Sequence, residues 1–133
     1  MALRVELVAP DGEVWAGSAR MVIAKTLDGD LGVLAGHPPV LGLLAEGSVV
    51  RILDPGDSEQ GEVVAAVSSG FLSVADDNVS ILAREAQLGS QVDVAGVRSR
   101  VESLEAEQQA PGEPEPAELR YSRALLRAAG DRS

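Results

Sequence analysis

The chain has 133 residues, of which 45% are hydrophobic, so it can form one domain with a core of its own. Aromatic residues make up only 2% and the formal net charge is −10, which argues against nucleic acid as a partner. Cysteine is absent, which excludes disulfides and thiolate metal sites. The longest apolar stretch, near Val40–Ala45, is too short to span a bilayer, and we expect a soluble, cytoplasmic protein.

The first two thirds of the chain have the pattern of short strands. Leu3, Val5 and Leu7 alternate with charged residues, which is typical of a strand with one face in solvent. Clusters rich in Gly, Pro, Asp and Asn separate such runs and suit hairpin turns. The clearest further runs are Met21–Ala24, Ser48–Leu53, Glu62–Val67, Phe71–Val74 and Val79–Ala83. We predict an antiparallel β-sandwich of about ten short strands over residues 1–88, as a docking domain.

A helical tail is predicted over residues 89–133. Asp93 can cap a first helix with one buried stripe. The prolines and the glycine within 110–116 cannot continue a helix, so we expect a break there. A second helix follows from Ala117 to Ala129, with Gly130 as its stop. The stripe of the first helix is Val94, Val97, Val101 and Leu104.

The stretch from Asp28 to Pro39 has the composition of a rigid, projecting loop. Asp28 and Gly29 supply a tight reversal, and Gly32 permits a close backbone approach. Pro38 and Pro39 fix φ and remove two backbone donors. A stiff projecting loop is a good docking surface, although an ordinary hairpin with a connecting loop has the same composition.

Three motifs follow one another in the strand-rich part. They are D-G-D-L-G-V-L-A-G-H-P-P-V at Asp28–Val40, V-S-S-G-F-L-S-V at Val67–Val74 and N-V-S-I-L-A at Asn78–Ala83. In this order they resemble the epsilon subunits of F-type ATP synthases, called delta in mitochondria. Asp30 stands for the family's Glu and Ala35 for its Pro, and the resemblance covers about Leu3–Asp93.

The resemblance implies a subunit of a rotating central stalk, which couples a membrane ring of c subunits to the gamma subunit. The sandwich would bind gamma, the stretch from Asp28 to His37 would face the c-ring, and catalysis would belong to other subunits. The subunit would be peripheral, at the cytoplasmic face of the cell membrane, and would need no cofactor or metal. The expected contact residues are Asp28, Gly29, Asp30, Leu31, Gly32, His37 and Pro38.

Other interpretations of the same residues stay open. His37 could hold the loop by bonding to backbone instead of contacting a partner. Asp28, Asp30 and His37 could serve as metal ligands or as an acid–base pair, which would need convergent geometry. A sugar-binding sandwich is disfavoured because aromatic platforms are few. A stand-alone β-sandwich adaptor is the main alternative, and it predicts no stable complex with a gamma-like coiled coil.

The second helix carries arginines in an otherwise acidic chain. One interpretation is pairing with acidic residues of the first helix, each exposed pair contributing about 0–1 kcal/mol. The other is contact with an acidic surface of the catalytic beta subunit, which the resemblance implies for a tail that restrains ATP hydrolysis. The arginines are Arg120, Arg123 and Arg127, and the acidic residues are Glu102, Glu105 and Glu107. We expect the tail as a whole to modulate hydrolysis.

A nucleotide-binding motif, I/L-D-x-x-R-A in many bacterial relatives, is degenerate here. The aligned residues are Val92, Asp93, Gly96 and Val97, with Gly96 in place of the phosphate-pairing arginine. A charge-assisted hydrogen bond of that kind contributes about 1.5–3 kcal/mol. We therefore predict weak ATP binding or none, and a calorimetric titration that found sub-millimolar affinity for the isolated chain would contradict this.

Overall fold

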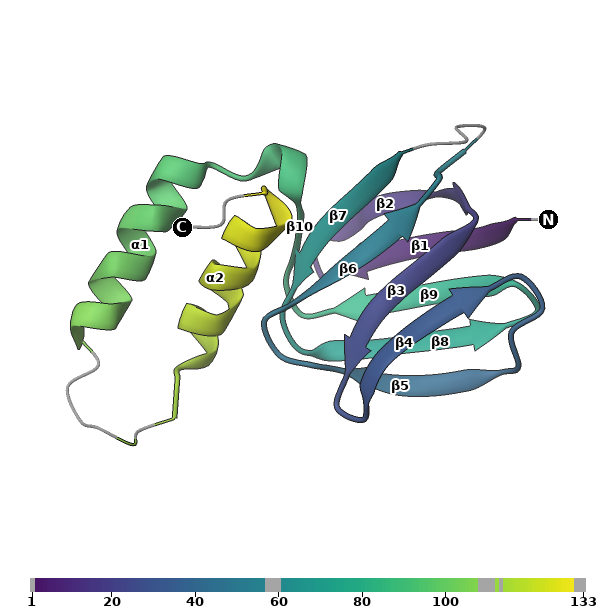
Figure 1. The fold of residues 1–133 in the computed structure, drawn as a ribbon, viewed down its shortest axis with the longest axis horizontal. Helices are drawn as coiled ribbons and strands as arrows, with labels where there is room; N and C mark the ends of the chain where they lie inside the picture. The colour runs from purple at the N-terminus through teal and green to yellow at the C-terminus, as the bar shows by residue number, and fades with distance from the viewer. Residues whose placement is uncertain (1, 57–60, 108–111, 113, 131–133) are drawn as a thin grey trace.

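The computed structural model describes residues 2–56, 61–107, 112 and 114–130 (Figure 1). Its strands come first and its helices last, so the predicted β-sandwich with two C-terminal helices is confirmed. The strands are β1 (Leu3–Ala9), β2 (Gly12–Ala19), β3 (Met21–Thr26), β4 (Gly29–Leu34), β5 (Val40–Leu44), β6 (Ser48–Leu53), β7 (Glu62–Val67), β8 (Gly70–Ala75), β9 (Asn78–Ala83) and β10 (Ala86–Leu88). The helices are a 3-10 helix η1 (Gly89–Gln91), α1 (Val94–Glu107) and α2 (Ala117–Ala128).

The strands form one sheet that folds back on itself around a core. Their order is β10-β7-β6-β3-β5-β8-β9-β1-β2, and β4 pairs with β3. The sheet bends between β3 and β5, which are joined through the pair Thr26 and Leu44. The prediction of a purely antiparallel sandwich is wrong at one place, because β1 pairs with β9 in parallel. The chain passes through six further strands after β2 before β9 returns beside β1 in the same direction.

The core confirms the alternation that the sequence shows. Leu3, Val5 and Leu7 are each at most 1% exposed, whereas Arg4 and Glu6 between them are exposed. The remaining core side chains are Val, Leu, Ile and Ala from both halves of the sheet. Burial of each large aliphatic side chain contributes about 1.5–3 kcal/mol, so this core holds the sandwich together with few aromatic residues.

The start of α1 and both ends of α2 match the sequence prediction closely. The Oδ1 atom of Asp93 accepts a hydrogen bond from Gly96 N at 3.2 Å, so Asp93 caps the start of α1. Gly130, with φ of 85°, follows the last turn of α2 in the left-handed region that stops a helix. The predicted break at 110–116 falls partly on residues 110, 111 and 113, which lie outside the described residues.

The C-terminal helix α2 lies between the sandwich and α1, as Figure 1 shows. One side of α2 packs on β7, and the other side packs on α1. Because α1 packs mainly on α2, it reaches the sandwich largely through that helix. The contacts to the sandwich are made by Ala124 and Leu125 with Ala66, and those to α1 by Leu119 and Leu126 with Val101 and Leu104.

Two glycines let the α2 backbone approach closely, Gly47 in the sandwich and Gly89 in η1. A Cβ atom at Gly89 would collide with the carbonyl oxygen of Ala128, and a Cβ atom at Gly47 would collide with Arg120. Arg127 Nη2 also donates a hydrogen bond to Gly47 O at 3.1 Å. We call Gly47 and Gly89 the glycine seat, since a larger residue at either position would push α2 away.

Tyr121 lies half-buried in the same interface, packed against the cluster of Ala66, Ala124 and Leu125. Burial raises the pKa of Tyr121 to about 12, and the nearby Glu85 carboxylate adds to the shift. Because it is the only tyrosine of the chain, its titration reports directly on the docking of α2.

We predict that Gly89→Ala displaces α2 and returns the pKa of Tyr121 from about 12 toward the ordinary 10. The overpacking should also lower the free energy of unfolding by about 1–3 kcal/mol. Absorbance titration of the tyrosinate measures the shift, with Ser90→Ala, an exposed neighbour in η1, as the control.

The stability of the wild-type protein should depend on pH at alkaline values, because folding raises the pKa of Tyr121. The folded pKa of Tyr121 exceeds the unfolded one, so the contribution is complete below pH 10 and is lost as pH rises toward 12. A Gly89→Ala protein with an unchanged tyrosine titration would contradict the proposed seat.

Candidate functional site

The stretch does not form one projecting loop; it forms the alternative that the sequence left open, a hairpin with a connecting loop, in which strand β4 has a turn at each end. Thr26 Oγ1 donates to Gly29 O at 2.8 Å and accepts from Asp28 N at 3.2 Å, which closes the β3–β4 turn. Strand β4 then runs for six residues, about 20 Å, before the loop that carries His37. The prediction of a single loop fails because Leu31 and Val33 alternate with exposed residues, and this pattern places β4 in the sheet.

The expected contact residues therefore form two separate groups. Asp28, Gly29 and Asp30 lie at the β3–β4 turn, whereas His37 and Pro38 lie beyond the other end of β4. Leu31 is half-buried on β4 and Gly32 is exposed, and both lie between the two groups. The interpretation of Asp28, Asp30 and His37 as metal ligands or as an acid–base pair fails, because the three side chains do not converge.

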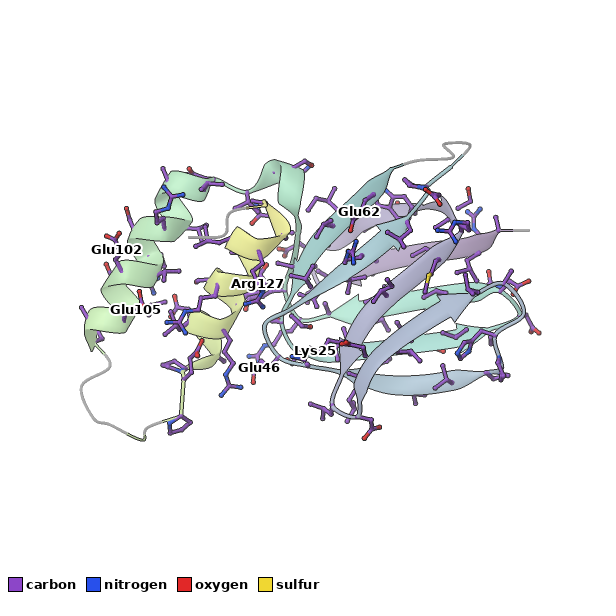
Figure 2. All side chains as sticks on the ribbon, in the orientation of Figure 1. Lys25, Glu46, Glu62, Glu102, Glu105 and Arg127 are labelled. Carbon is purple, nitrogen blue, oxygen red and sulfur yellow. The ribbon has the colours of Figure 1, made fainter. Side chains whose placement is uncertain are left out.

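Asp30 lies on the side of the sandwich that faces the tail. It pairs in register with Lys25 of β3, and both residues line a cleft of about 410 Å³ together with Glu46 and Arg127. Figure 2 shows Lys25, Glu46 and Arg127 gathered where α2 meets the sheet. Oppositely charged residues across a strand pair stabilise it modestly, so Asp30 belongs to a charged surface shared with the tail.

The loop after β4 is a compact turn that presents His37. His37 N donates to Leu34 O at 3.1 Å, and Gly36 has φ of 85°, the value expected at the third position of a type II turn. His37 Nδ1 lies 2.6 Å from Pro38 O. A carbonyl oxygen can only accept, so Nδ1 carries the proton and Nε2 of the neutral ring is an acceptor. His37 thus bonds to backbone and still offers an acceptor to a partner.

A row of apolar side chains is exposed on one face of β5, β8 and β9. Leu43 pairs with Phe71, and Phe71 pairs with Leu82, so the three side chains point to the same face of the sheet. Leu41 lies two residues before Leu43 and is on the same face. Their exposed fractions are 71% for Leu41, 58% for Leu43, 41% for Phe71 and 41% for Leu82.

We call Leu41, Leu43, Phe71 and Leu82 the apolar strip. Leu27, which is 68% exposed, adjoins it, since Leu27 N donates to Leu43 O at 3.0 Å. The only phenylalanine of the chain lies here instead of in the core. A contiguous exposed patch with an aromatic residue marks an interaction surface.

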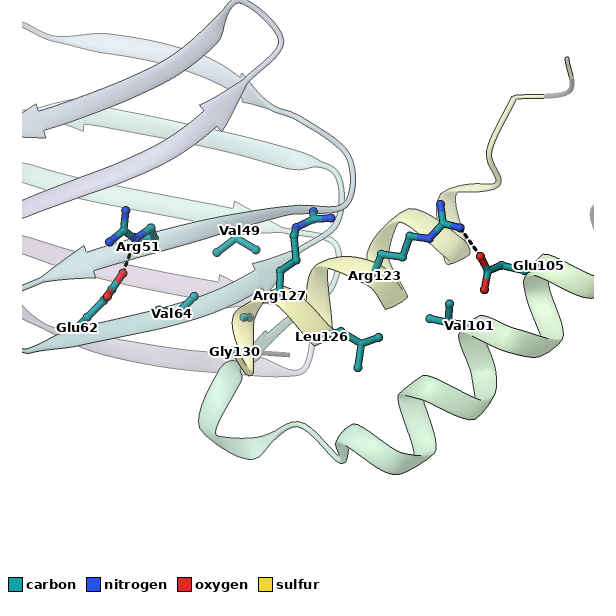
Figure 3. Close-up of a pocket in the computed structure, with 11 residues that line it drawn as sticks. Val49, Arg51, Glu62, Val64, Val101, Glu105, Arg123, Leu126, Arg127 and Gly130 are labelled. Atoms are coloured by element: carbon teal, nitrogen blue, oxygen red, sulfur yellow. Dashed lines mark hydrogen bonds and ion pairs between the residues drawn. The ribbon is translucent and has the colours of Figure 1, made fainter. Parts of the chain in front are cut away.

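A cleft of about 1010 Å³ lies between β6, β7 and the two helices (Figure 3). Arg51 pairs with Glu62 on its sheet side. Arg123 pairs on its helix side with Glu105 of α1 at 2.8 Å and also with Glu115 at 2.8 Å. The charges that line the cleft are thus largely matched within the chain, and each exposed pair contributes about 0–1 kcal/mol.

The tail arginines divide between two partners. Arg123 pairs with Glu105, as the interpretation of pairing between the helices expects. Arg120 instead faces Glu46 of the sandwich at 3.7 Å, and Arg127 donates to Gly47 O. The sequence does not predict these contacts of Arg120 and Arg127 with the sandwich. They require the tertiary fold to bring Glu46 and Gly47 next to α2.

The residues of the degenerate nucleotide motif serve the start of α1. Val92 and Val97 pack against the cluster of Ala66, Ala124 and Leu125, and Asp93 caps the helix through Gly96 N. A Cβ atom at Gly96 would lie 2.6 Å from Asp93 Oδ2, so with an arginine there the Asp93 carboxylate would have to shift.

The apolar strip is the surface that sequence reasoning missed. The run Val40–Leu44 could have indicated it, because this strand has apolar residues on both of its faces. A strand with one face in solvent would instead alternate apolar and polar residues. No helix within the described parts of the chain is long and apolar enough to cross a membrane.

Comparison with known proteins identifies the family. The model of the ATP synthase delta/epsilon chain β-sandwich domain matches residues 2–89. The ATP synthase epsilon chain of Thermobifida fusca is 52% identical over 129 residues, covering 96% of this chain and 91% of that protein. The epsilon chain of Streptomyces coelicolor is 43% identical over 131 residues, covering 98% and 97%.

A solved structure shares the fold along nearly the whole chain. It is a chain in the cryo-EM structure of the Euglena gracilis mitochondrial ATP synthase, with a TM-score of 0.72 at 21% identity, covering 97% of this chain and 79% of that chain. The resemblance inferred from the three motifs is confirmed, and the chain belongs to the ATP synthase delta/epsilon chain family.

Proposed function

We propose that the chain is the epsilon subunit in the central stalk of a proton-driven rotary ATP synthase. In this role it couples the c-ring to the gamma subunit and takes no part in catalysis. The apolar strip carries the proposal, because it is a ready-made docking face on a chain whose relatives are named ATP synthase epsilon chain. The matched charges of the large cleft suit a structural role rather than a catalytic one.

The gamma subunit is the proposed occupant of the apolar strip. The four side chains leave apolar surface in water, and a partner that covered them would gain about 25 cal/mol for each Å² removed from solvent. The turn at Asp28 and Gly29 adjoins the strip through Leu27, so these residues are proposed as further contacts at its edge.

The c-ring is the proposed partner of the loop that holds His37 and Pro38. Figure 1 shows the β4–β5 loop at the end of the sandwich farthest from the helices. A tail that restrains hydrolysis must reach the catalytic subunits, so the opposite end is the one left to face the membrane. The subunit would therefore be peripheral at the cytoplasmic face of the cell membrane.

If the apolar strip binds gamma, acidic substitutions within it should weaken that complex. The double substitution Leu43→Asp with Phe71→Asp should weaken binding to gamma at least 100-fold, since about 1.5–3 kcal/mol is lost for each apolar side chain. Both residues are well exposed, so the isolated chain should still fold. Co-purification with gamma from reconstituted subunits measures the effect.

Leu34→Asp is the matched control, because Leu34 is 48% exposed but lies on β4, outside the strip. Undiminished gamma binding by the double variant would rule out the strip as the gamma surface. Failure of the wild-type chain to bind gamma would favour the alternative of a stand-alone adaptor.

The tail is proposed to modulate hydrolysis, with Arg120, Arg123 and Arg127 as its charged face. In the docked tail these arginines bond within the chain, so contact with the beta subunit would require them to exchange partners. ATP binding is proposed to be weak or absent, since Gly96 stands where the nucleotide motif has its phosphate-pairing arginine.

Deletion of residues 117–133 should raise ATP hydrolysis by the assembled complex. The deletion also removes the main packing partner of α1, so a second variant is needed to separate charge from packing. Replacing the three arginines by glutamine keeps the apolar faces of α2 and should raise hydrolysis to a similar level. If neither variant changes hydrolysis, the regulatory role is wrong.

A further inference from the structure

One side chain ties the His37 loop to the rest of the sandwich. Gly36 N donates a hydrogen bond of 2.7 Å to Oδ1 of Asp77, which lies 41 residues further along the chain. Asp77 belongs to the β8–β9 turn, and Figure 1 shows this turn beside the β4–β5 loop at the far end of the sandwich. The bond therefore joins two turns from different parts of the sheet.

The β8–β9 turn has a backbone that favours glycine but carries aspartate. Ala75 pairs with Asn78, and the two residues between them, Asp76 and Asp77, have φ of 51° and 62°. Positive φ at both central positions defines a type I′ hairpin, in which the second position is usually Gly. Aspartate tolerates this conformation less well than glycine, and at position 77 it adds a carboxylate that reaches Gly36.

The turn that carries the carboxylate is itself anchored. Arg4 N donates to Asp77 O at 2.8 Å, which fixes the turn to the start of β1. Asn78 Nδ2 donates to Asp76 O at 3.1 Å within the turn. An acceptor on a fixed turn loses little entropy when it binds the loop, so the bond holds Gly36 effectively.

The turn that carries His37 lacks a proline at the position where type II turns often have one. Ala35 occupies the second position of its type II turn, where proline commonly presets φ. Alanine restricts that angle less than proline does, so an external contact can add to the turn's own hydrogen bond from His37 N to Leu34 O. Asp77 supplies such a contact one residue away from His37.

We propose that Asp77 is a positioning residue for the His37 loop: its carboxylate fixes Gly36 and so presents His37 and Pro38 to the c-ring. Only the identity of the partner rests on the proposed function. The hydrogen bond and its effect on the loop can be tested in the isolated chain.

The first test is amide hydrogen exchange of Gly36 in the full chain, measured by NMR. Asp77→Gly keeps the positive φ and removes the carboxylate, so exchange at Gly36 should accelerate at least fivefold. Asp76→Gly makes the same backbone change in the same turn and should stay within twofold of wild type. Asp77→Asn keeps an acceptor and should fall between the two, and Ala45 N, bonded to Lys25 O, is the internal reference.

The second test uses membranes depleted of this subunit, to which the chain is added back. The concentration that restores half of proton-driven ATP synthesis should rise about three- to tenfold for Asp77→Gly, in line with the loss of one hydrogen bond. Asp76→Gly should match wild type. Adding Ala35→Pro to Asp77→Gly should restore the wild-type value, because proline stiffens the loop by another route.

The possible results distinguish failure of the positioning role of Asp77 from failure of the proposed function. Unchanged Gly36 exchange in Asp77→Gly would overturn the positioning role. Faster exchange with an unchanged half-restoring concentration, or no rescue by Ala35→Pro, would show that Asp77 holds the loop but does not serve the partner contact. If the wild-type chain itself restored no synthesis, the proposed function would fail, while the exchange result would still decide whether Asp77 positions the loop.

Discussion

The packing of α2 on both of its sides is the interaction on which the arrangement of the tail depends. The backbone of α2 contacts Gly47 of the sandwich and Gly89 of η1, where a Cβ atom would collide with the helix. On its other side α2 packs Leu119 and Leu126 against α1. Since α1 packs mainly on α2, both helices keep their place only while this seat is filled. The tail is thus one layered unit, and a change at the seat acts on all of it.

The protein has three candidate contact surfaces, and they lie on different parts of the molecule. The apolar strip occupies one face of β5, β8 and β9, the His37 loop lies at the far end of the sandwich, and the tail covers β6 and β7 (Figure 1). The proposed role between ring and gamma subunit requires separate contacts on a stiff body. A close-packed core of Val, Leu and Ile, with Asp77 bonding the loop to the β8–β9 turn, provides that stiffness.

The sequence predicted those features that depend on local pattern. The alternation at Leu3, Val5 and Leu7, the cap at Asp93 and the stop at Gly130 were all visible in the residues themselves. The sequence did not decide between a projecting loop and a hairpin around strand β4, because its glycines and the following prolines suit both. The parallel pairing of β1 with β9, the glycine seat and the bond from Gly36 to Asp77 depend on long-range contacts, which no local pattern encodes.

In the proposed assembly a partner covers the apolar strip, and the other contacts depend on this one. Because the chain has no cysteine, Leu41→Cys introduces a single thiol at the most exposed position of the strip. The measurement is the rate of maleimide labelling of this thiol in the free chain and in the assembled ATP synthase. The account predicts labelling at least tenfold slower in the complex, and an equal rate in both would contradict it.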